Sequence, residues 1–186
     1  MQQIFLVGDS IRLGYRSYVA DALKEEAQVF SSDDNARFTA YTLRYLHEWA
    51  RLCLHPENVS VVHWNNGLWD ACHFLNDPLP ITPLPVYLDN LERIAGRIRL
   101  LFPNAKIIFA SSTAVAENHP RVRNEEIERM NAAARERLTP LGIAFNDLHA
   151  IVRAHPEYIC PDLTHLTDAG YAALGSAVAD KIREVW

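Results

Sequence analysis

The sequence predicts an α/β protein in which a mainly parallel sheet is covered by helices on both faces. Short apolar runs alternate with longer segments of helical period, and this rhythm is typical of chains built from strand–helix–strand units. The chain has 186 residues, of which 49% are hydrophobic and 22% are charged. That length and balance are those of one globular domain with a sizeable core. We therefore expect a single domain over residues 1–186.

Five short apolar runs predict the strands of this sheet. The first of them contains the strand-like run Ile4–Val7, which follows the N-terminus almost at once. The intervals between the runs leave room for a helical segment in each connection. The predicted strands are Gln3–Val7, Ala27–Phe30, Val59–Trp64, Lys106–Ala110 and Ile143–Asn146.

Five segments of helical period lie between or after these strands. They are expected at about Gly14–Glu25, Ala36–Leu52, Pro85–Leu101, Asn124–Leu138 and Asp168–Val185. Pro103 and Asn104 end the third helix, and the sequence Thr139–Gly142 ends the fourth. Thr167 in front of Asp168 is a typical cap for the last helix.

Two connections are longer than a simple link requires. One runs over residues 67–83 and carries Trp69, His73 and three prolines, and the other runs over residues 111–123 and contains His119. In open parallel sheets, ligands bind beyond the carboxyl ends of the strands. Both connections follow a predicted strand, so we expect both to border the ligand-binding crevice.

Charge and hydropathy argue against two classes of partner. The formal net charge is −5 and the chain has no long basic run, which argues against binding to nucleic acid. No apolar run approaches the ~20 residues that a membrane-spanning helix needs. The N-terminus shows no basic leader followed by an apolar stretch. We expect a cytoplasmic protein without nucleic-acid or membrane partners, and the sequence leaves its oligomeric state open.

Neither a metal nor a cofactor is expected. The cysteines are odd in number and match no zinc-binding spacing, which fits a reducing compartment; they are Cys53, Cys72 and Cys160. His63, Asp70 and His73 could be drawn together as a metal site. However, His63 falls on a predicted strand and His73 in a long loop, so this set is a weak candidate.

The first candidate for chemistry is Ser10, in the tripeptide Gly8-Asp9-Ser10 directly after the first predicted strand. The glycine allows a sharp turn, and a serine at the start of a helix lies among free backbone N–H groups. This position gives a hydroxyl nucleophile with oxyanion donors beside it. The same tripeptide is also a common structural turn, and Asp9 is expected to be structural.

A serine hydroxyl needs a base to take its proton. Asp162 and His165 stand three residues apart, just before the last predicted helix. From this spacing the carboxylate can reach Nδ1 of the imidazole and leave Nε2 to face Ser10, as in a catalytic triad. Taken alone, Asp162 could merely cap a turn. The doubly wound fold, however, can bring both ends of the chain to one edge of the sheet.

Together, the run Ile4–Ser10 and the Asp162–His165 motif resemble the SGNH (GDSL-type) hydrolase superfamily, and the resemblance covers the whole chain in order and spacing. It implies a three-layer α/β/α sandwich with a five-stranded, flavodoxin-like sheet. It also implies hydrolysis of carboxylic esters by Ser10, His165 and Asp162 without a metal. The chain lacks the G-x-S-x-G elbow of ordinary α/β-hydrolases, which agrees with this assignment.

The inner motifs of the superfamily match less closely. The chain has no glycine between Phe30 and Leu52, and its third block reads Asn65-Asn66-Gly67-Leu68. It resembles a branch with an Asn-x-Gly-Leu block found among carbohydrate-active esterases. The resemblance assigns the oxyanion hole to Asn65 and the Ser10 N–H, with Asn35 replacing the missing glycine. Asn66 is the second choice after Asn65, and a plain turn is the structural alternative.

Several neighbouring residues are candidates for substrate contact. Arg12 and Tyr15 follow Ser10 closely enough to reach a substrate, although Tyr15 could equally pack in the core. Trp64 and Trp69 could form a stacking wall for a sugar, or they could belong to the core. Asn66 completes this set.

These observations lead to the hypothesis of a serine esterase that forms an acyl-Ser10 intermediate. We expect short acyl groups, chiefly acetyl, on a small molecule or a glycan, because no lid-like apolar helix is present to cover a lipid tail. Three alternatives remain: an acyltransferase with the same triad, an inactive hydrolase, and a flavodoxin-like module that only binds a small ligand. The last would need a glycine-rich phosphate loop, and Leu6–Ile11 contains one glycine.

Overall fold

The computed structural model describes residues 1–74 and 77–186. Its centre is a five-stranded sheet of order β2-β1-β3-β4-β5, in which every pair of neighbours is parallel. The strands are β1 (Gln2–Val7), β2 (Ala27–Ser31), β3 (Val59–Asn65), β4 (Lys106–Ala110) and β5 (Ala144–Asn146). The expected five-stranded parallel sheet is confirmed, and the strand limits differ from expectation by one residue at most.

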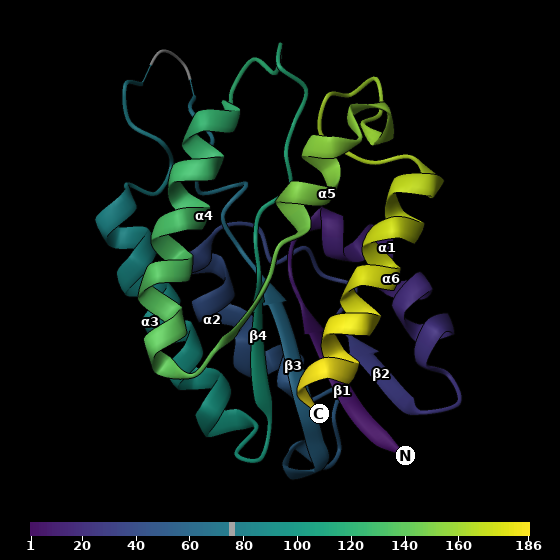
Figure 1. Cartoon of the computed structure of the whole chain (residues 1–186). Helices are drawn as coiled ribbons and strands as arrows, with labels where there is room; N and C mark the ends of the chain where they lie inside the picture. The colour runs from purple at the N-terminus through teal and green to yellow at the C-terminus, as the bar shows by residue number, and fades with distance from the viewer. Residues whose placement is uncertain (75–76) are drawn as a thin grey trace.

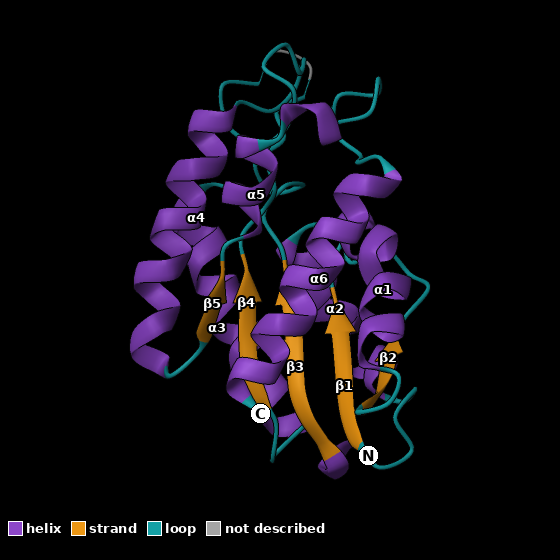
Figure 2. Cartoon of the chain, turned by 45° about the vertical axis from the view of Figure 1, so that its right-hand side comes forward, coloured by secondary structure: helices purple, strands orange, loops and turns teal. Residues whose placement is uncertain are grey.

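Helices cover both faces of the sheet, which confirms the three-layer α/β/α sandwich (Figures 1 and 2). Helices α1 and α6 pack together on one face, and α3 packs beside α2 and α4 on the other. The main helices are α1 (Ser10–Leu23), α2 (Thr39–Ala50), α3 (Leu84–Leu101), α4 (Asn124–Leu138), α5 (Leu148–Ala154) and α6 (Asp168–Val185). None of those within the described residues is long and apolar enough to cross a membrane.

The helices differ from the prediction chiefly at the starts of α1 and α2 and in one additional helix. Helix α1 begins at Ser10, four residues early, because the Asp9 carboxylate caps it by accepting the Ile11 N–H at 3.0 Å. Helix α2 begins at Thr39 rather than at Ala36, after a residue in extended conformation. The seven-residue helix α5 was not predicted, and its N-cap is Asp147.

The core explains why the sheet is stable with helices on both faces. The central strands β1 and β3 are buried along most of their length, as expected for parallel strands covered on both sides. The carboxyl ends of all strands point to one edge of the molecule, where the long connections gather (Figure 2). Both chain ends, by contrast, lie at the opposite edge. This arrangement puts the candidate residues at the carboxyl-end edge, as a doubly wound fold requires.

Candidate active site

Ser10 occupies the first position of α1, immediately beyond β1. Its backbone N–H is one of the first N–H groups of the helix, which have no partner within the helix itself. Gly8 shapes this corner, because a Cβ atom there would lie 1.9 Å from Oδ1 of Asn65. The end of β1 can therefore approach Asn65 only through a glycine.

His165 connects Ser10 with Asp162. Its Nε2 lies 2.9 Å from Oγ of Ser10, and its Nδ1 lies 2.6 Å from Oδ2 of Asp162. The other oxygen, Oδ1 of Asp162, accepts the backbone N–H groups of Thr164 at 3.0 Å and His165 at 2.9 Å. The structure thus brings the three predicted residues together in the order hydroxyl, imidazole and carboxylate.

The charge of Asp162 is fixed by its hydrogen bonds. The Thr164 N–H first, and then the His165 side chain and N–H, lower the pKa of Asp162 to about 2. The carboxylate is therefore ionised across the pH range in which an enzyme works. An ionised Asp162 keeps a proton on Nδ1 of His165 and leaves Nε2 free to accept the proton of Ser10.

The loop that carries Asp162 and His165 is held together at its two ends. An antiparallel bridge joins Ile159 to Leu166, and the Cys160 N–H donates to the His165 carbonyl at 2.7 Å. Between the two site residues, Leu163 has a φ of 72°, in the left-handed region that non-glycine residues adopt rarely. Its carbonyl accepts the Ala116 N–H at 3.0 Å. The loop is thus fixed to the connection after β4.

Asn65, at the end of β3, is 4% exposed. Its Oδ1 is buried against Gly8 without a hydrogen-bond partner among the described residues. The Asn65 amide also lies close enough to Asp9 to lower the pKa of that carboxyl group, which burial raises. Asn65 therefore lies against the turn of Gly8 and Asp9 that leads to Ser10.

Asn35 lies beside the same corner but in a different manner from the one expected. Its side-chain Oδ1 accepts the Arg37 N–H at 2.9 Å and forms a local turn. The Ala36 N–H donates to the Gly8 carbonyl at 3.1 Å, which holds the turn against the end of β1. Among the described residues, the Asn35 backbone N–H has no acceptor. Asn35 can therefore supply a donor only through its backbone N–H, because its side chain is engaged in the turn.

Four of the expected substrate contacts are unavailable because the side chains are buried. Arg12 is 1% exposed, and its guanidinium donates to the carbonyls of Gly8, Ser32 and Asp34 at 3.0, 2.5 and 2.6 Å. These bonds hold the connection after β2. The guanidinium has no exposed face to offer a substrate, and its burial lowers the pKa of Arg12 to about 10.

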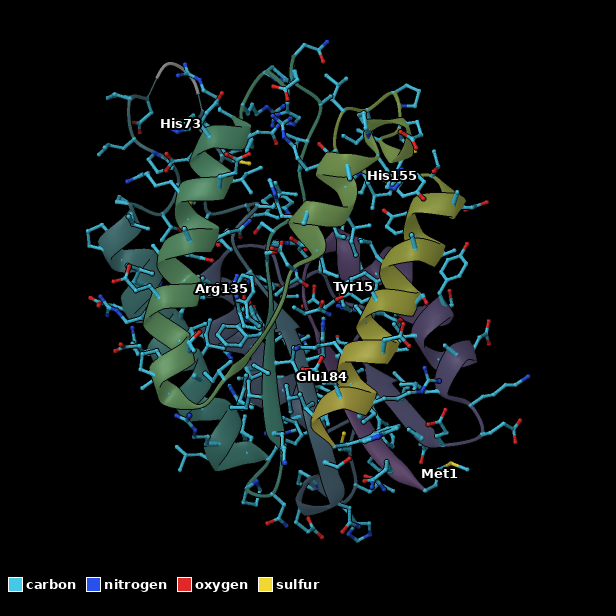
Figure 3. The ribbon with its side chains drawn as sticks, viewed as in Figure 1. Met1, Tyr15, His73, Arg135, His155 and Glu184 are labelled. Atoms are coloured by element: carbon cyan, nitrogen blue, oxygen red, sulfur yellow. The ribbon has the colours of Figure 1, made fainter. Side chains whose placement is uncertain are left out.

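The other three are equally enclosed. Tyr15 packs in the core (Figure 3), and its hydroxyl lies 3.4 Å from Nδ1 of His63. The Trp64 indole is fully buried against Phe109 and donates to Oδ1 of Asn66 at 2.8 Å. Asn66 is fully buried too, and its Nδ2 donates to the Arg37 carbonyl at 2.9 Å. The expected sugar contact of Trp64 is therefore corrected to core packing.

Trp69, by contrast, lines a cleft of about 330 Å³ together with Ser10 and His165. Both long connections contribute walls to this cleft, as the sequence predicts. The remaining lining residues are Leu68, Cys72, Phe74, His119, Pro120, Arg121, Val122, Asp162, Leu163 and Thr164. The sequence motifs do not mark Phe74, His119 or Arg121 as site residues, although they predict that both connections border the crevice.

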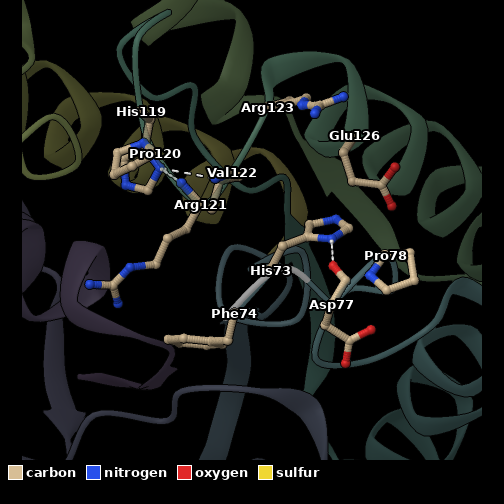
Figure 4. Close-up of a pocket in the computed structure, with 10 residues that line it drawn as sticks. All are labelled: His73, Phe74, Asp77, Pro78, His119, Pro120, Arg121, Val122, Arg123 and Glu126. Carbon is tan, nitrogen blue, oxygen red and sulfur yellow. Dashed lines mark hydrogen bonds between the residues drawn. The ribbon is translucent and has the colours of Figure 1, made fainter.

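A second, larger cleft of about 790 Å³ adjoins the first (Figure 4). The two share Phe74 and the segment His119–Val122. His73 lines the second cleft and does not reach the serine, and its Nδ1 donates to the Asp77 carbonyl at 3.3 Å. The segment between His73 and Asp77 also contains Leu75 and Asn76, which lie outside the described residues.

The alternative metal set is not assembled. Within the described residues, no group of three or more histidine, cysteine or acidic side chains is arranged to hold a metal ion. His63 instead bonds Tyr15 and the Asn146 amide, at 3.2 Å from Nε2. Asp70 accepts the N–H and hydroxyl of Thr39 and so anchors the start of α2.

Comparison with known proteins places this geometry in context. The profile of the GDSL-like lipase/acylhydrolase family matches residues 6–173. A search of curated protein sequences gave no significant match. Among solved structures, a lipase/acylhydrolase from Enterococcus faecalis is similar, with a TM-score of 0.82 at 20% identity over 99% of this chain and 96% of that one.

Two further structures share the fold. An acetylxylan esterase from Geobacillus stearothermophilus has a TM-score of 0.76 at 16% identity, covering 97% of this chain and 94% of that one. A carbohydrate esterase family 3 protein from Talaromyces cellulolyticus has a TM-score of 0.71 at 12% identity, covering 99% and 97%. At these identities the likeness establishes a common architecture over the full length.

Proposed function

Because the chain belongs to the GDSL-like lipase/acylhydrolase family and is a carboxylic ester hydrolase, we propose that Ser10 is its nucleophile and that short-chain, chiefly acetyl, esters are its substrates. The observation that carries this proposal is the position of His165, within hydrogen-bond distance of both Ser10 and Asp162. A hydroxyl, an imidazole and a carboxylate in this chain of contacts form an activated nucleophile.

The reaction proceeds in two steps. Nε2 of His165 takes the Ser10 proton while Oγ attacks the ester carbonyl carbon, and the tetrahedral adduct collapses with cleavage of the bond to the alcohol oxygen. The alcohol leaves with the proton from His165, which leaves an acyl-Ser10 ester. Water then attacks that ester, again with His165 as base, and releases the acid and free Ser10. Asp162 holds the imidazole in the productive tautomer throughout.

Fixed donors stabilise the negative charge that develops on the carbonyl oxygen. We assign this role to the Ser10 N–H, the Asn65 amide and the Asn35 N–H, which border one corner at the ends of β1 and β3. These groups are neutral, and the fold holds them in place before the substrate binds. The loss of one such donor typically costs about 3–4 kcal/mol of transition-state stabilisation.

The preference for a short acyl group rests on the size and lining of the cleft. A volume of about 330 Å³ lies at the lower end of the range of ligand sites, which is roughly 300–1,000 Å³. Trp69 and Phe74 add aromatic surface to its wall, which suits a sugar ring or another flat alcohol. Two proteins of similar fold are named for acetylxylan and carbohydrate ester hydrolysis, and we extend that class to this chain as a proposal.

The decisive experiment compares hydrolysis of 4-nitrophenyl acetate, butyrate and octanoate by the wild type and by Ser10→Ala and His165→Ala. We expect the acetate to be turned over best, and each substitution to lower kcat by about 10⁴-fold or more. Ser17→Ala is the matched control, since Ser17 lies exposed on the same helix. Unchanged turnover in folded Ser10→Ala would overturn the nucleophile, and preference for the octanoate would overturn the acyl-length proposal.

A further inference from the structure

We infer that the cleft beside Ser10 contains an anion subsite built on Arg121, and that the ester it accepts carries a negatively charged oxyacid group bound by this guanidinium. The inference rests on the proposed function, because it names the substrate class of the same site. It concerns a residue outside the proposed triad and outside the proposed oxyanion hole.

Arg121 lies where a substrate group next to the ester would lie. It lines the cleft of about 330 Å³ together with Ser10 and His165, and it also lines the adjoining cleft. Figure 4 shows its side chain extending away from Asp77 and Glu126, the two acidic residues that line the larger cleft. The guanidinium therefore points away from the carboxylates of the larger cleft.

No carboxylate neutralises this guanidinium. Across residues 1–74 and 77–186, the Arg121 side chain takes part in no salt bridge, and the two residues outside that description, Leu75 and Asn76, are uncharged. Glu126 pairs with Arg129 at 2.6 Å instead. Asp162, the acidic residue lining the smaller cleft, is engaged by His165 and two backbone N–H groups.

Seven of the fifteen arginines form a salt bridge within the described residues, and Arg121 is the one arginine among the described residues that line the cleft of Ser10. Arg16, Arg137, Arg153 and Arg183, for example, each pair with an acidic side chain on another segment. The chain carries 23 acidic residues against 18 lysines and arginines, so partners are plentiful elsewhere on the surface. A guanidinium without one, in the cleft that holds Ser10, is available to an anionic ligand.

The position of Arg121 is set by the fold before any ligand binds. Nδ1 of His119 accepts the N–H groups of Arg121 at 3.2 Å and Val122 at 3.0 Å, and the Arg121 carbonyl accepts the His73 N–H at 2.9 Å. The guanidinium lies 5.2 Å from the centre of the Phe74 ring, within cation–π range. A cation positioned in advance loses less entropy when it binds its anion.

The field of Arg121 reaches the wall of the cleft. Burial raises the pKa of Cys72 to about 11, and the Arg121 charge acts in the opposite direction. Burial lowers the pKa of His119, and the Arg121 charge lowers it further. Both side chains line the cleft of Ser10, so the charge of Arg121 also acts on a substrate there, beside the opposing charge of Asp162 that raises the pKa of His119.

The test uses pairs of esters that share a shape and differ in charge. One pair places the charge on the alcohol half: 4-acetoxybenzoate and 4-isopropylphenyl acetate. The other places it on the acid half: the 4-nitrophenyl monoester of glutaric acid and 4-nitrophenyl 5-methylhexanoate. For each enzyme, the ratio of kcat/KM for the anionic to the neutral ester is compared with the wild-type ratio, which cancels intrinsic differences in ester reactivity.

We expect Arg121→Gln to lower this ratio about tenfold for the alcohol-half pair, mainly through KM, because an acetyl ester has no room for a charge on its acid half. Arg121→Lys retains most of the ratio. Arg123→Gln is the matched control, since Arg123 lines the larger cleft without lining that of Ser10. About 0.5 M NaCl lowers the wild-type ratio and leaves that of Arg121→Gln unchanged.

A tenfold fall in the kcat/KM ratio of the acid-half pair alone also supports the subsite. It shows that the bound charge lies on the acyl group of the substrate. Equal ratios in Arg121→Gln and Arg123→Gln for both pairs overturn the inference, provided that both variants melt at the wild-type temperature. Failure of the proposed function gives a different result, because Ser10→Ala would then hydrolyse the neutral esters as fast as the wild type does.

Discussion

At the scale of single residues, the tautomer of His165 decides whether Ser10 can react. Asp162 accepts the Nδ1 proton through one oxygen and two backbone N–H groups through the other. In Asp162→Asn, Oδ1 can keep the backbone bonds, while the new amide N–H₂ faces Nδ1. The imidazole then carries its proton on Nε2 and cannot accept the one from Ser10.

We therefore expect Asp162→Asn to lower kcat by about 10³–10⁴-fold with little change in KM and in melting temperature. Steady-state kinetics on 4-nitrophenyl acetate measure this. Asp168→Asn, an exposed change in the first turn of α6, is the control. A kcat for Asp162→Asn within threefold of the wild type contradicts the orienting role.

The residues that the sequence misassigned could have been assigned from periodicity. Arg12 stands two positions after Ser10 on a helix, about 200° around its axis, so it points away from the nucleophile. Trp64 precedes Asn65 on β3, and neighbouring strand residues point to opposite faces. Arg121 is different, because its place in the cleft depends on contacts with Phe74 and His119, which local sequence does not specify.

At the scale of elements, the connection after β2 is held by α1. The three carbonyl groups bound by Arg12 lie in the segments that end β1 and follow β2. The connection carries Asn35 and Ala36, so Arg12 indirectly positions the proposed third oxyanion donor. The family usually has a glycine here, whereas this chain uses a buried guanidinium to fix the loop.

Arg12→Met should lower the free energy of unfolding by about 3 kcal/mol, because it removes hydrogen bonds to three carbonyl groups, two of them on buried segments. Chemical denaturation measures this change. Arg16→Gln is the matched control on the same helix, since its ion pair with Asp33 is exposed and is worth about 1 kcal/mol or less. Equal losses of unfolding free energy in the two variants would contradict this role of Arg12 in holding the connection after β2.

Element boundaries show which signals in a sequence are strong. The strands were located closely because buried parallel strands read as short apolar runs. The start of α1 lies four residues before the expected one, although Asp9 is a typical cap and buried apolar residues recur at helical spacing from Ile11 onward. Helix α5 was missed because seven residues carry too few turns for a helical period to be recognised.

At the scale of the whole molecule, the sheet interior contains a titratable group that ties three elements together. His63 on β3 is fully buried between Tyr15 of α1 and Asn146 of β5. The Asn146 amide donates to Nε2, so Nδ1 carries the proton and donates to the Tyr15 oxygen. Burial lowers the pKa of His63 to about 3, which keeps the imidazole neutral in the folded protein.

This neutral histidine makes stability depend on pH. The unfolded chain protonates His63 below its ordinary pKa of about 6.5, whereas the folded chain does so only near 3. Unfolding therefore takes up a proton between these values, and stability falls as pH decreases, by about 1.4 kcal/mol per unit and about 2 kcal/mol at pH 5. Asp9 and Asp70, whose pKa values burial raises, contribute a slope of the opposite sign.

The His63 contribution is isolated by comparing variants. Free energies of unfolding measured by denaturation at several pH values from 5 to 8 should fall less steeply toward acid in His63→Gln than in the wild type. Glutamine can still bond Tyr15 and Asn146 but does not titrate. His55→Gln, at an exposed position, should retain the wild-type slope, and an identical slope in all three proteins would show that the buried histidine is not the source.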